Sequence, residues 1–336
     1  MDVTREAAKV LRCVSDRHDL GLHFQEFDLG AERYLRTGVA ITEEEWAELA
    51  AFDAIFLGAM GDPRVPGNEH ARAILLGMRF RFDLYINLRP VRLFDARFSP
   101  LKNVRPEDVD IVMFRENTEG LYVGVGGQMK RGTADEVAMQ EDVNTRKGVE
   151  RIIRAAFEFA RAKQRRKVTL TDKANAMEHV GELWRRVFRE VASEYADVKT
   201  DAVYVDALAM NMILKPADYD VIVAPNLFGD ILSDVAAALV GGLGLAPSAN
   251  LHPGRPGLFE PVHGSAPPLV GTNRANPLAA VLTAALLVEQ LGHADIARRI
   301  EATVAEAIAA GETTPDLGGS LGTDAVGDGI CKRLVG

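Results

Sequence analysis

The sequence predicts an α/β fold, on three observations. Short apolar runs of strand length alternate along the 336 residues with longer amphipathic segments of helix length. Three of the apolar runs end on polar groups, as strands do when their carboxyl ends form a functional edge. No G-x-G-x-x-G motif occurs in the chain, so a standard Rossmann site is not supported.

In the first half of the chain, residues 6–14 have a helical period and predict a helix. Residues 54–60 are typical of a buried strand that runs into a Gly/Pro loop. Residues 110–115 predict a second strand, which ends at Arg115-Glu116-Asn117, and residues 148–161 predict a strongly amphipathic helix. Strands and helices therefore alternate in this half of the chain, as in an α/β fold.

The second half continues the alternation. Residues 167–171 predict a strand that ends at Asp172-Lys173, and residues 220–224 predict another that ends at Pro225-Asn226. Helices are expected over residues 183–195, 279–291 and 296–310. Polar strand endings with complementary chemistry favour an active-site cleft over simple exits into solvent.

Composition narrows the class of protein. Hydrophobic residues make up 47% of the chain, enough for a large core and about two domains by length. The net charge is −9 and no long basic run occurs, which disfavours a nucleic-acid-binding protein. No apolar run is long enough to span a membrane, and no signal peptide is expected at the polar start. Cys13 and Cys331 stand far apart, which favours a cytoplasmic protein without a disulfide framework.

Asp230 and Asp234 are candidate metal ligands. They lie four residues apart, on one face of a helix that we expect to begin at Gly229 and Asp230. Two close carboxylates repel unless a cation lies between them, and Mg²⁺ or Mn²⁺ prefers such oxygen ligands. The alternative is a helix with two solvated acids. The apolar flanking residues indicate a half-buried helix, which favours the metal interpretation.

Three arginines and two proton-transfer groups are further candidates. Arg79, Arg89 and Arg115 suit a polycarboxylate substrate, because guanidinium groups bind carboxylates through paired hydrogen bonds. The alternative for each is an ion pair at the surface. Tyr122 and Lys173 could transfer protons, since a lysine near other cations has a lowered pKa. Lys173 is alternatively a salt bridge at a strand end.

Residues 260–267 are too rich in Gly and Pro for a helix or a central strand. A loop of small residues lets the backbone approach phosphate or ribose groups closely. His263, in this loop, is a candidate cofactor contact or simply a capped loop histidine.

Together these segments resemble the β-decarboxylating dehydrogenases, the family of isocitrate, isopropylmalate, homoisocitrate and tartrate or D-malate dehydrogenases. The resemblance covers residues 3–319. Its motifs are long and specific, and they lie at residues 115–120, 172–175, 226–234, 260–267 and 314–319.

The resemblance implies roles for the candidate residues. Arg79, Arg89 and Arg115 would bind the carboxylates and hydroxyl of a malate-type substrate. Lys173 would take the hydroxyl proton, and Tyr122 would protonate the enolate that remains when CO₂ departs.

The same resemblance implies a metal, a cofactor and a partner. Asp230 and Asp234 would bind Mg²⁺ or Mn²⁺, with Asp206 and Lys173 supplied by the other subunit of a homodimer with shared active sites. NAD is the expected cofactor. The residues expected to hold it are His263, Gly264, Ser265, Ala266, Asn276 and Asp316.

The substrate's side chain is less closely specified. Isocitrate dehydrogenases carry a serine and an asparagine where this chain has Ala73 and Leu75, and homoisocitrate enzymes typically carry an arginine at Leu76. Leu75 and Leu76 are similar to the apolar wall that receives the isopropyl group of 3-isopropylmalate. D-malate and tartrate enzymes have a like pair, and the stretches 126–128, 143–149 and 248–253 resemble theirs. Isopropylmalate is placed slightly ahead, with D-malate or tartrate as the alternative.

The chain departs from the family pattern in two places. The family usually opens with a short strand and a Gly-Asp-Gly-Ile-Gly loop, whereas this chain begins where the following helix begins. A mis-set start is favoured over an altered sequence and over a real variant that fills the gap otherwise. Under it, this chain is expected to be unstable or inactive and an extended version stable and active. Pro268 and Leu269 stand where NAD enzymes often have an aspartate and NADP enzymes a Lys-Tyr pair. NAD is therefore expected by elimination.

Two other classes of function compete with this interpretation. One is a catalytically impaired homologue that still dimerises, and the other is a metal-dependent lyase that uses no nicotinamide. The family's division implies a two-lobed isopropylmalate dehydrogenase-like fold with a mixed sheet. Residues 1–84 and 240–336 would form a discontinuous cofactor lobe, and residues 85–239 a central lobe with the dimer interface.

Overall fold

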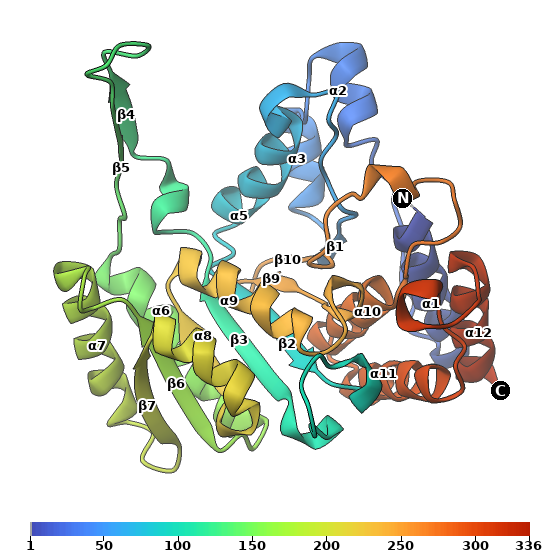
Figure 1. Ribbon diagram of the computed structural model, residues 1–336. Helices are drawn as coiled ribbons and strands as arrows, with labels where there is room; N and C mark the ends of the chain where they lie inside the picture. Colours follow the sequence, from blue (N-terminus) through green and yellow to red (C-terminus); the bar gives the residue numbers. More distant parts are fainter. Residues whose placement is uncertain (1) are drawn as a thin grey trace. The chain divides into compact units, whose positions relative to one another are not determined.

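The computed structural model describes residues 2–336 of the chain, which divides into two compact units (Figure 1). Unit 1 consists of Met1–Leu84, Arg92–Pro106 and Ala237–Gly336. Unit 2 consists of Tyr85–Val91 and Glu107–Ala236. Unit 1 is thus assembled from three stretches of chain, and each unit has strands and helices of its own.

The strands of unit 1 are short and mixed in direction. Strand β1 (Ala54–Phe56) pairs in parallel with β10 (Gly257–Phe259), which pairs antiparallel with β9 (Ala249–Leu251). The strand expected over residues 54–60 is therefore too long. Its partner β10 has only three residues, and pairing ends after the Leu57 amide donates to the Phe259 carbonyl at 2.8 Å.

Helices surround these strands, and one of them, α10 (Leu278–Gln290), is buried over nearly its whole length. Its sequence is apolar on every side, which is typical of a central helix. It packs against α1 and α11 and against β10. The helices of unit 1 other than α10 are α1 (Asp2–His18), α2 (Ala31–Thr37), α3 (Glu43–Leu49), α4 (Glu69–Ala71), α5 (Gly77–Arg81), α11 (Ala294–Ala309) and α12 (Thr323–Val335).

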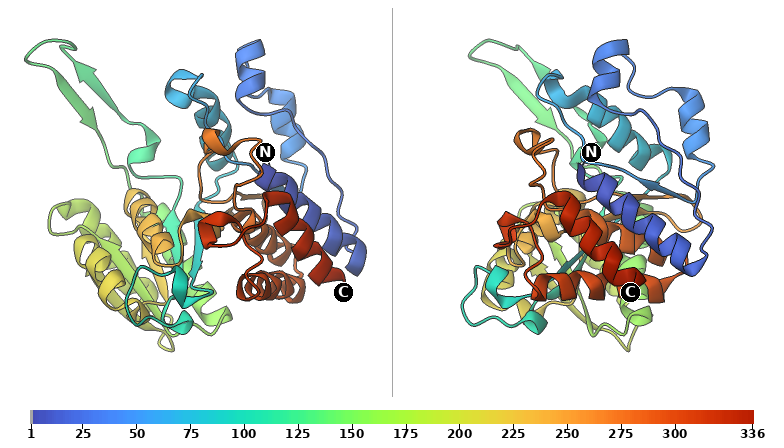
Figure 2. Two further views of the ribbon diagram at one scale, coloured as in Figure 1. Left: turned by 45° about the vertical axis from the view of Figure 1, so that its right-hand side comes forward. Right: turned by 90° about the vertical axis from the view of Figure 1, so that its right-hand side faces the viewer.

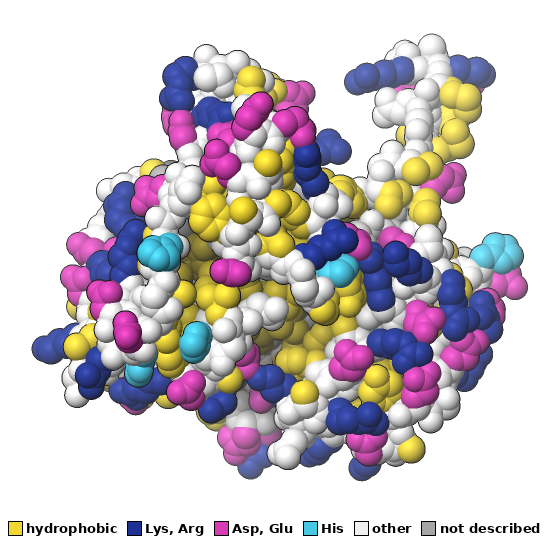
Figure 3. Space-filling model, turned by 180° about the vertical axis from the view of Figure 1, so that it is seen from behind, with side chains coloured by type: hydrophobic (Ala, Val, Ile, Leu, Met, Phe, Trp, Pro, Cys, Tyr) yellow, Lys and Arg dark blue, Asp and Glu magenta, His cyan; other side chains and the backbone are white. Residues whose placement is uncertain are grey.

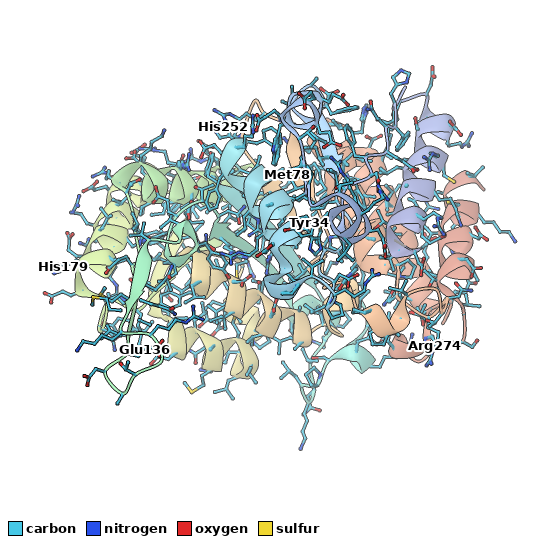
Figure 4. All side chains as sticks on the ribbon, turned by 90° about the horizontal axis from the view of Figure 1, so that it is seen from above. Tyr34, Met78, Glu136, His179, His252 and Arg274 are labelled. Atoms are coloured by element: carbon cyan, nitrogen blue, oxygen red, sulfur yellow. The ribbon has the colours of Figure 1, made fainter. Side chains whose placement is uncertain are left out.

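A second core of unit 1 lies under α3 and α5. Trp46, Ile74, Met78 and Leu84 are buried there together. Figure 4 labels Met78, which is fully buried, and Tyr34 on α2. A Cβ at Gly77 would lie 3.0 Å from the Trp46 ring, so this glycine lets α5 approach α3 closely.

The main strands of unit 2 pair in the order β2-β3-β8-β6-β7. The pairs β3–β8, β8–β6 and β6–β7 are parallel. Their bounds are β2 (Ile86–Arg92), β3 (Asp110–Glu116), β6 (Lys167–Asp172), β7 (Lys199–Tyr204) and β8 (Val221–Ala224). Since parallel strands end at the same edge, the polar endings of β3, β6 and β8 lie along one edge of the unit.

Four helices complete unit 2: α6 (Arg146–Ala162), α7 (Glu178–Ala192), α8 (Val205–Leu214) and α9 (Asn226–Ala238). Helix α6 packs on β3, β8 and β6, and α8 contacts β6 and β7 (Figure 1). The expectation that α9 begins at Gly229 and Asp230 is wrong. The Gly229 amide already donates to the Pro225 carbonyl at 2.9 Å, so the helix begins at Asn226.

A β-hairpin stands away from the rest of unit 2. It consists of β4 (Gly126–Met129) and β5 (Val137–Gln140), and Figure 4 labels Glu136 beside its turn. Met129, Val137 and Met139 are 40–53% exposed on it, and apolar side chains are visible on this arm in Figure 3. Among residues 2–336, no helix combines the length and the apolar character that crossing a membrane requires.

Candidate active site

Arg115 is the centre of a polar cluster at the strand-end edge of unit 2. It lies on β3 with 1% of its surface exposed. Its Nε donates to the carbonyl and side-chain oxygens of Asn226, both at 3.0 Å, and its Nη1 donates to Asp230 Oδ1 at 2.5 Å. A buried guanidinium needs such partners, and here the first turn of α9 supplies them.

Three further side chains meet on or beside Asp230. Arg89, from β2, has its Nη2 3.3 Å from Asp230 Oδ1 and donates through Nη1 to Ser233 Oγ at 2.6 Å. Tyr122 donates its hydroxyl to Asp230 Oδ2 at 2.8 Å. Unit 2 thus brings together five of the residues singled out from the sequence, since Asp234 Oδ1 also lies 3.7 Å from Arg89 Nη1.

Two glycines allow this cluster to form. A Cβ at Gly229 would lie 2.7 Å from Arg115 Cβ and 2.8 Å from its Cγ, so only glycine lets α9 pass so close to β3. Gly120 has a φ of +78°, and its Cβ would lie 3.2 Å from Asn226 Cβ. The Asn226 side chain donates to the Glu119 carbonyl at 3.0 Å, which joins the loop after β3 to the start of α9.

That loop is held by two glutamates. The Glu116 carboxylate, 1% exposed, accepts from the Thr118 amide and hydroxyl and from the Glu119 amide at 2.7–3.1 Å. Burial raises the pKa of Glu116 above its ordinary value, against the lowering effect of these hydrogen bonds. Glu119 in turn accepts from the amide and hydroxyl of Thr145, the cap of α6.

The electrostatics of Asp230 and Asp234 fit a hard divalent cation. Burial raises the pKa of Asp234, and the neighbouring Asp230 carboxylate also raises it, while Arg89 and Arg115 lower it. A cation between two carboxylates one helical turn apart would offset that repulsion, and carboxylate oxygens are the donors that Mg²⁺ and Mn²⁺ prefer. Among residues 2–336, no three His, Cys, Asp or Glu side chains are grouped for a metal.

Lys173 and Asp206 form a separate pair in unit 2. Lys173 follows the last residue of β6, Asp206 lies in the first turn of α8, and Nζ donates to Oδ1 at 2.8 Å. Hydrogen bonding to Lys173 lowers the pKa of Asp206. Asp206 is not gathered with Asp230 and Asp234 into a group of three.

Unit 1 carries the third arginine. Arg79, on α5, is 6% exposed, and its Nη2 donates to Glu260 Oε1 at 3.1 Å. Asn250 donates to the same oxygen at 3.0 Å, while Arg79 Nε is buried without a hydrogen-bond partner. An unpartnered buried donor is costly, so this guanidinium is well suited to a further acceptor.

Leu75 and Leu76 lie just before Arg79 in the chain. They belong to a π-helical turn, Arg72–Leu76, and both side chains are half-buried. Such turns are rare and occur frequently at functional sites. Leu75 packs against the core that contains Met78.

The loop after Glu260 contains four of the candidate cofactor residues, His263 to Ala266. His263 Nδ1 lies 3.1 Å from the Gly264 carbonyl, and its Nε2 is covered without a partner. Burial lowers the pKa of His263, so the ring is neutral at neutral pH. Ser265 Oγ would lie 3.5 Å from a Cβ at Gly61, and Ala266 adopts a left-handed conformation with a φ of 41°.

Asn276 and Asp316 form a second polar group in unit 1. Asn276 Nδ2 donates to Asp316 Oδ2 at 3.0 Å, and Thr314 Oγ1 donates to Asp316 Oδ1 at 2.5 Å. A Cβ at Gly244 would lie 2.9 Å from Asn276 Nδ2, so the glycine gives this pair room. The structure thus brings together two of the residues expected to hold the cofactor.

Sequence reasoning missed several partners of the predicted residues. Ser233 binds Arg89, Glu260 binds Arg79, and Glu116 organises the loop before Tyr122. Ser233 lies three residues after Asp230 on the same helical face, so the helical period could have identified it. Nothing in the sequence pairs Glu260 with Arg79, because the contact joins distant stretches of chain.

Comparison with known proteins gives matches along the chain. A family model described as "Isocitrate/isopropylmalate dehydrogenase" matches residues 1–330. The 3-isopropylmalate dehydrogenase of Thermobifida fusca is 46% identical over 99% of this chain and 94% of its own length. That of Streptomyces coelicolor is 45% identical, over 100% and 95%. The crystal structure of isocitrate dehydrogenase from Methylococcus capsulatus superposes with a TM-score of 0.91 at 37% identity, covering 100% and 96% of the two chains.

Proposed function

The chain belongs to the isocitrate/isopropylmalate dehydrogenase family, as its motifs predicted, and from that premise we propose that it is a 3-isopropylmalate dehydrogenase. The reaction is the NAD-dependent oxidative decarboxylation of the substrate. The observation that carries the proposal is the meeting of Arg89, Arg115 and Tyr122 on Asp230. Several relatives at 45–46% identity bear the same name.

The proposed substrate is a dicarboxylate, and the three arginines would bind its carboxylate groups. Arg89 and Arg115 present guanidinium groups at the strand-end edge of unit 2, and Arg79 is assigned the same role from unit 1. Paired hydrogen bonds from a guanidinium to a carboxylate fix orientation as well as charge. Leu75 and Leu76 would contact the isopropyl group, which is apolar and gains from leaving water.

Two residues are assigned the proton transfers. Lys173 Nζ would accept the proton of the substrate's hydroxyl, and its contact with Asp206 keeps the amine in place. The Tyr122 hydroxyl would donate a proton to the carbon that loses CO₂. Because that hydroxyl already donates to Asp230 Oδ2, the tyrosine is held at the cluster with its proton directed into it.

NAD and a divalent metal are part of the proposal. NAD, when bound, accepts the hydride, and His263, Gly264, Ser265, Ala266, Asn276 and Asp316 are assigned to hold it. Asp230 and Asp234 are assigned to a Mg²⁺ or Mn²⁺ ion, which when bound polarises the substrate's oxygen atoms. Asp206 is assigned to the same ion from a second subunit, since it is not grouped with them in the chain.

We further propose that the active form is a homodimer. Unit 2 exposes apolar side chains that a monomer would leave in water. On α8 and α9 these are Met210, Ile213, Leu214 and Ile231, each 46–65% exposed. The hairpin exposes Met129, Val137 and Met139 in the same way.

The proposal is tested by a parallel assay. Purified protein is mixed with Mn²⁺, NAD and either 3-isopropylmalate, D-malate, tartrate or isocitrate, and reduced nicotinamide is followed by absorbance. We expect the highest kcat/KM with 3-isopropylmalate. A higher value with isocitrate would refute the substrate assignment, and a higher value with NADP than with NAD would refute the cofactor assignment.

D-malate or tartrate is the second candidate substrate. It is favoured by the stretches 126–128, 143–149 and 248–253, which resemble the enzymes that use those acids. Higher kcat/KM with D-malate in the same assay would establish it. Absence of turnover on all four acids with retained binding of Mn²⁺ and substrate would favour a catalytically impaired homologue. Product without added nicotinamide would favour a lyase.

A further inference from the structure

Cys13 and Cys331 lie at opposite ends of the chain but in neighbouring helices. Cys13 is on α1 and Cys331 on α12, and the two helices run side by side in the same direction (Figure 2). Lys9 on α1 reaches Asp328 on α12, with 2.6 Å between Nζ and Oδ1. Because the helices are parallel, successive turns of α1 face successive turns of α12.

Gly327 brings the two helices unusually close. A Cβ at this position would lie 2.0 Å from Glu6 Oε2 and 3.0 Å from Glu6 Cβ, so no other residue fits there unless Glu6 moves. Cys331 follows Gly327 by one helical turn, and Cys13 follows Glu6 by two turns, so both thiols lie on the same seam.

We propose that Cys13 and Cys331 form a redox-active thiol pair that a low-molecular-weight disulfide oxidises to an intramolecular disulfide joining α1 to α12. Disulfides require closely approaching backbones, and the Gly327 contact supplies such an approach one turn away. Neither cysteine has a part in the proposed dehydrogenase reaction, so this property is independent of it.

The difference in exposure between the two thiols determines which cysteine reacts first. Cys13 is partly exposed, whereas Cys331 is buried with 9% of its surface accessible. Burial raises the pKa of the Cys331 thiol, and the neighbouring Cys13 thiol raises it further. Since the thiolate is the attacking species, Cys13 reacts first and Cys331 second.

With oxidised glutathione as the oxidant, the steps balance. The Cys13 thiolate attacks one sulfur of the glutathione disulfide, whose S–S bond breaks, and one glutathione leaves as its thiolate. Cys331 then loses its proton and attacks Cys13 Sγ, which releases the second glutathione. Two protein thiols are oxidised, one external disulfide is reduced to two thiols, and the two protons pass to the released glutathiones.

The test uses the full chain and oxidised glutathione. After incubation and acid quenching, intact mass should show the loss of two hydrogen atoms, and an unreduced peptide map should show Cys13 joined to Cys331. Dithiothreitol should reverse both results. The midpoint of thermal unfolding should rise by several degrees on oxidation, because the cross-link closes nearly the whole chain into one loop.

Single variants separate this from non-specific oxidation. Cys331→Ser should stop at a mixed disulfide with one glutathione on Cys13, and Cys13→Ser should remain unmodified while folded. A stable glutathione adduct on the unsubstituted chain, cross-linked dimers, or two persistently free thiols would each overturn the proposal. Should either variant fail to fold, the peptide map of the unsubstituted chain decides.

Discussion

At the scale of single residues, Asp230 is the point at which the side chains of the cluster meet, since it accepts hydrogen bonds from both Arg115 and Tyr122. Arg89, Arg115, Asp230 and Asp234 were each singled out beside an alternative in surface ion pairing or solvation, and Tyr122 was singled out as a proton-transfer group. The structure gathers all five, and burial of the two arginines removes the surface alternative for them. The partners Ser233 and Glu260 were missed because a serine and a glutamate carry no signal until the fold places them.

Arg89→Lys keeps the positive charge but loses the planar fork that reaches Ser233 and Asp230. We expect kcat/KM to fall by about ten- to a hundredfold, which corresponds to the loss of one or two charge-assisted hydrogen bonds. Arg92→Lys, on the same strand but 56% exposed, is the matched control and should remain within about twofold of the parent enzyme. Equal losses in the two variants would contradict the assignment of Arg89.

Tyr122→Phe removes only the hydroxyl that donates to Asp230. Since general acid catalysis contributes roughly 10²–10⁴-fold, we expect kcat to fall within that range while the protein stays folded. Tyr34→Phe removes a comparable hydroxyl, which donates to Glu69 at the surface, and should leave kcat unchanged. Only the final protonation loses its acid, so the keto-acid product measured by rapid quenching should lag behind the reduced nicotinamide measured by stopped flow. A kcat at the parent level would exclude Tyr122 as the acid.

The buried Glu116 carboxyl predicts a pH dependence of stability. Its pKa is raised in the folded chain, so the folded state binds the proton more tightly than the unfolded state does. Its contribution therefore favours folding most at low pH, and stability falls as pH rises from the ordinary glutamate value of 4.5 through the raised folded value.

Glu116→Gln should flatten this part of the curve, measured as the free energy of unfolding in urea at a series of pH values. Glu158→Gln removes an exposed carboxyl from α6 and should leave the slope as it was. A slope unchanged by the Glu116 substitution would mean that other groups dominate the titration.

At the scale of elements, prediction succeeded where apolar runs are continuous and failed where they are interrupted. β3, β6, β8, α10 and α11 were placed within a few residues. β2 contains Arg89 and Pro90, and the edge strand β7 is largely exposed, so neither carries the apolar signal of a buried strand. β1 was predicted too long and α9 too late, because both bounds depend on pairing with residues elsewhere in the chain.

Gly229→Ala tests how closely α9 must approach β3. The added methyl group would meet the Arg115 side chain at 2.7 Å, so either the helix or the arginine must move. We expect a loss of about 1–3 kcal/mol in the free energy of unfolding, typical of overpacking, together with a large loss of kcat/KM.

Gly329→Ala is the matched control, since a Cβ there comes no nearer than 3.6 Å to Glu312. Alanine is the better helix former, so this variant should be as stable as the parent or slightly more so. Both effects are read from urea unfolding curves, and a neutral Gly229→Ala would show that the close contact has no structural role.

At the scale of the whole molecule, the family and the mixed α/β architecture could be predicted from the motifs, because those motifs are long. The assignment of residues 92–106 to unit 1 could not, since no composition change marks that boundary. Quaternary structure cannot be predicted from composition either, and the proposed homodimer rests on the apolar side chains that unit 2 exposes.

Leu214→Asp places a charge on the most exposed of these side chains, at 65%. We expect the dimer to dissociate, so that the molar mass from light scattering falls to that of one chain. Turnover should also be lost, because Lys173 and Asp206 are assigned to the active site of the other subunit. Val335→Asp, at a 51% exposed position on α12 of unit 1, should leave mass and turnover intact. An active monomer would contradict the shared active site.

The division of unit 1 into three stretches also has a consequence in time. The ribosome makes α1 long before α10 and α12, the helices that pack against it, which begin only at residues 278 and 323. β1 likewise lacks its partner β10 until residue 259 has been made. Unit 2 is complete at residue 236, so during synthesis the inserted unit can fold while the surrounding one must wait. During most of translation, the nascent chain therefore exposes the apolar face of α1 and the unpaired edge of β1. These surfaces are buried only when β10, α10 and α12 have been made.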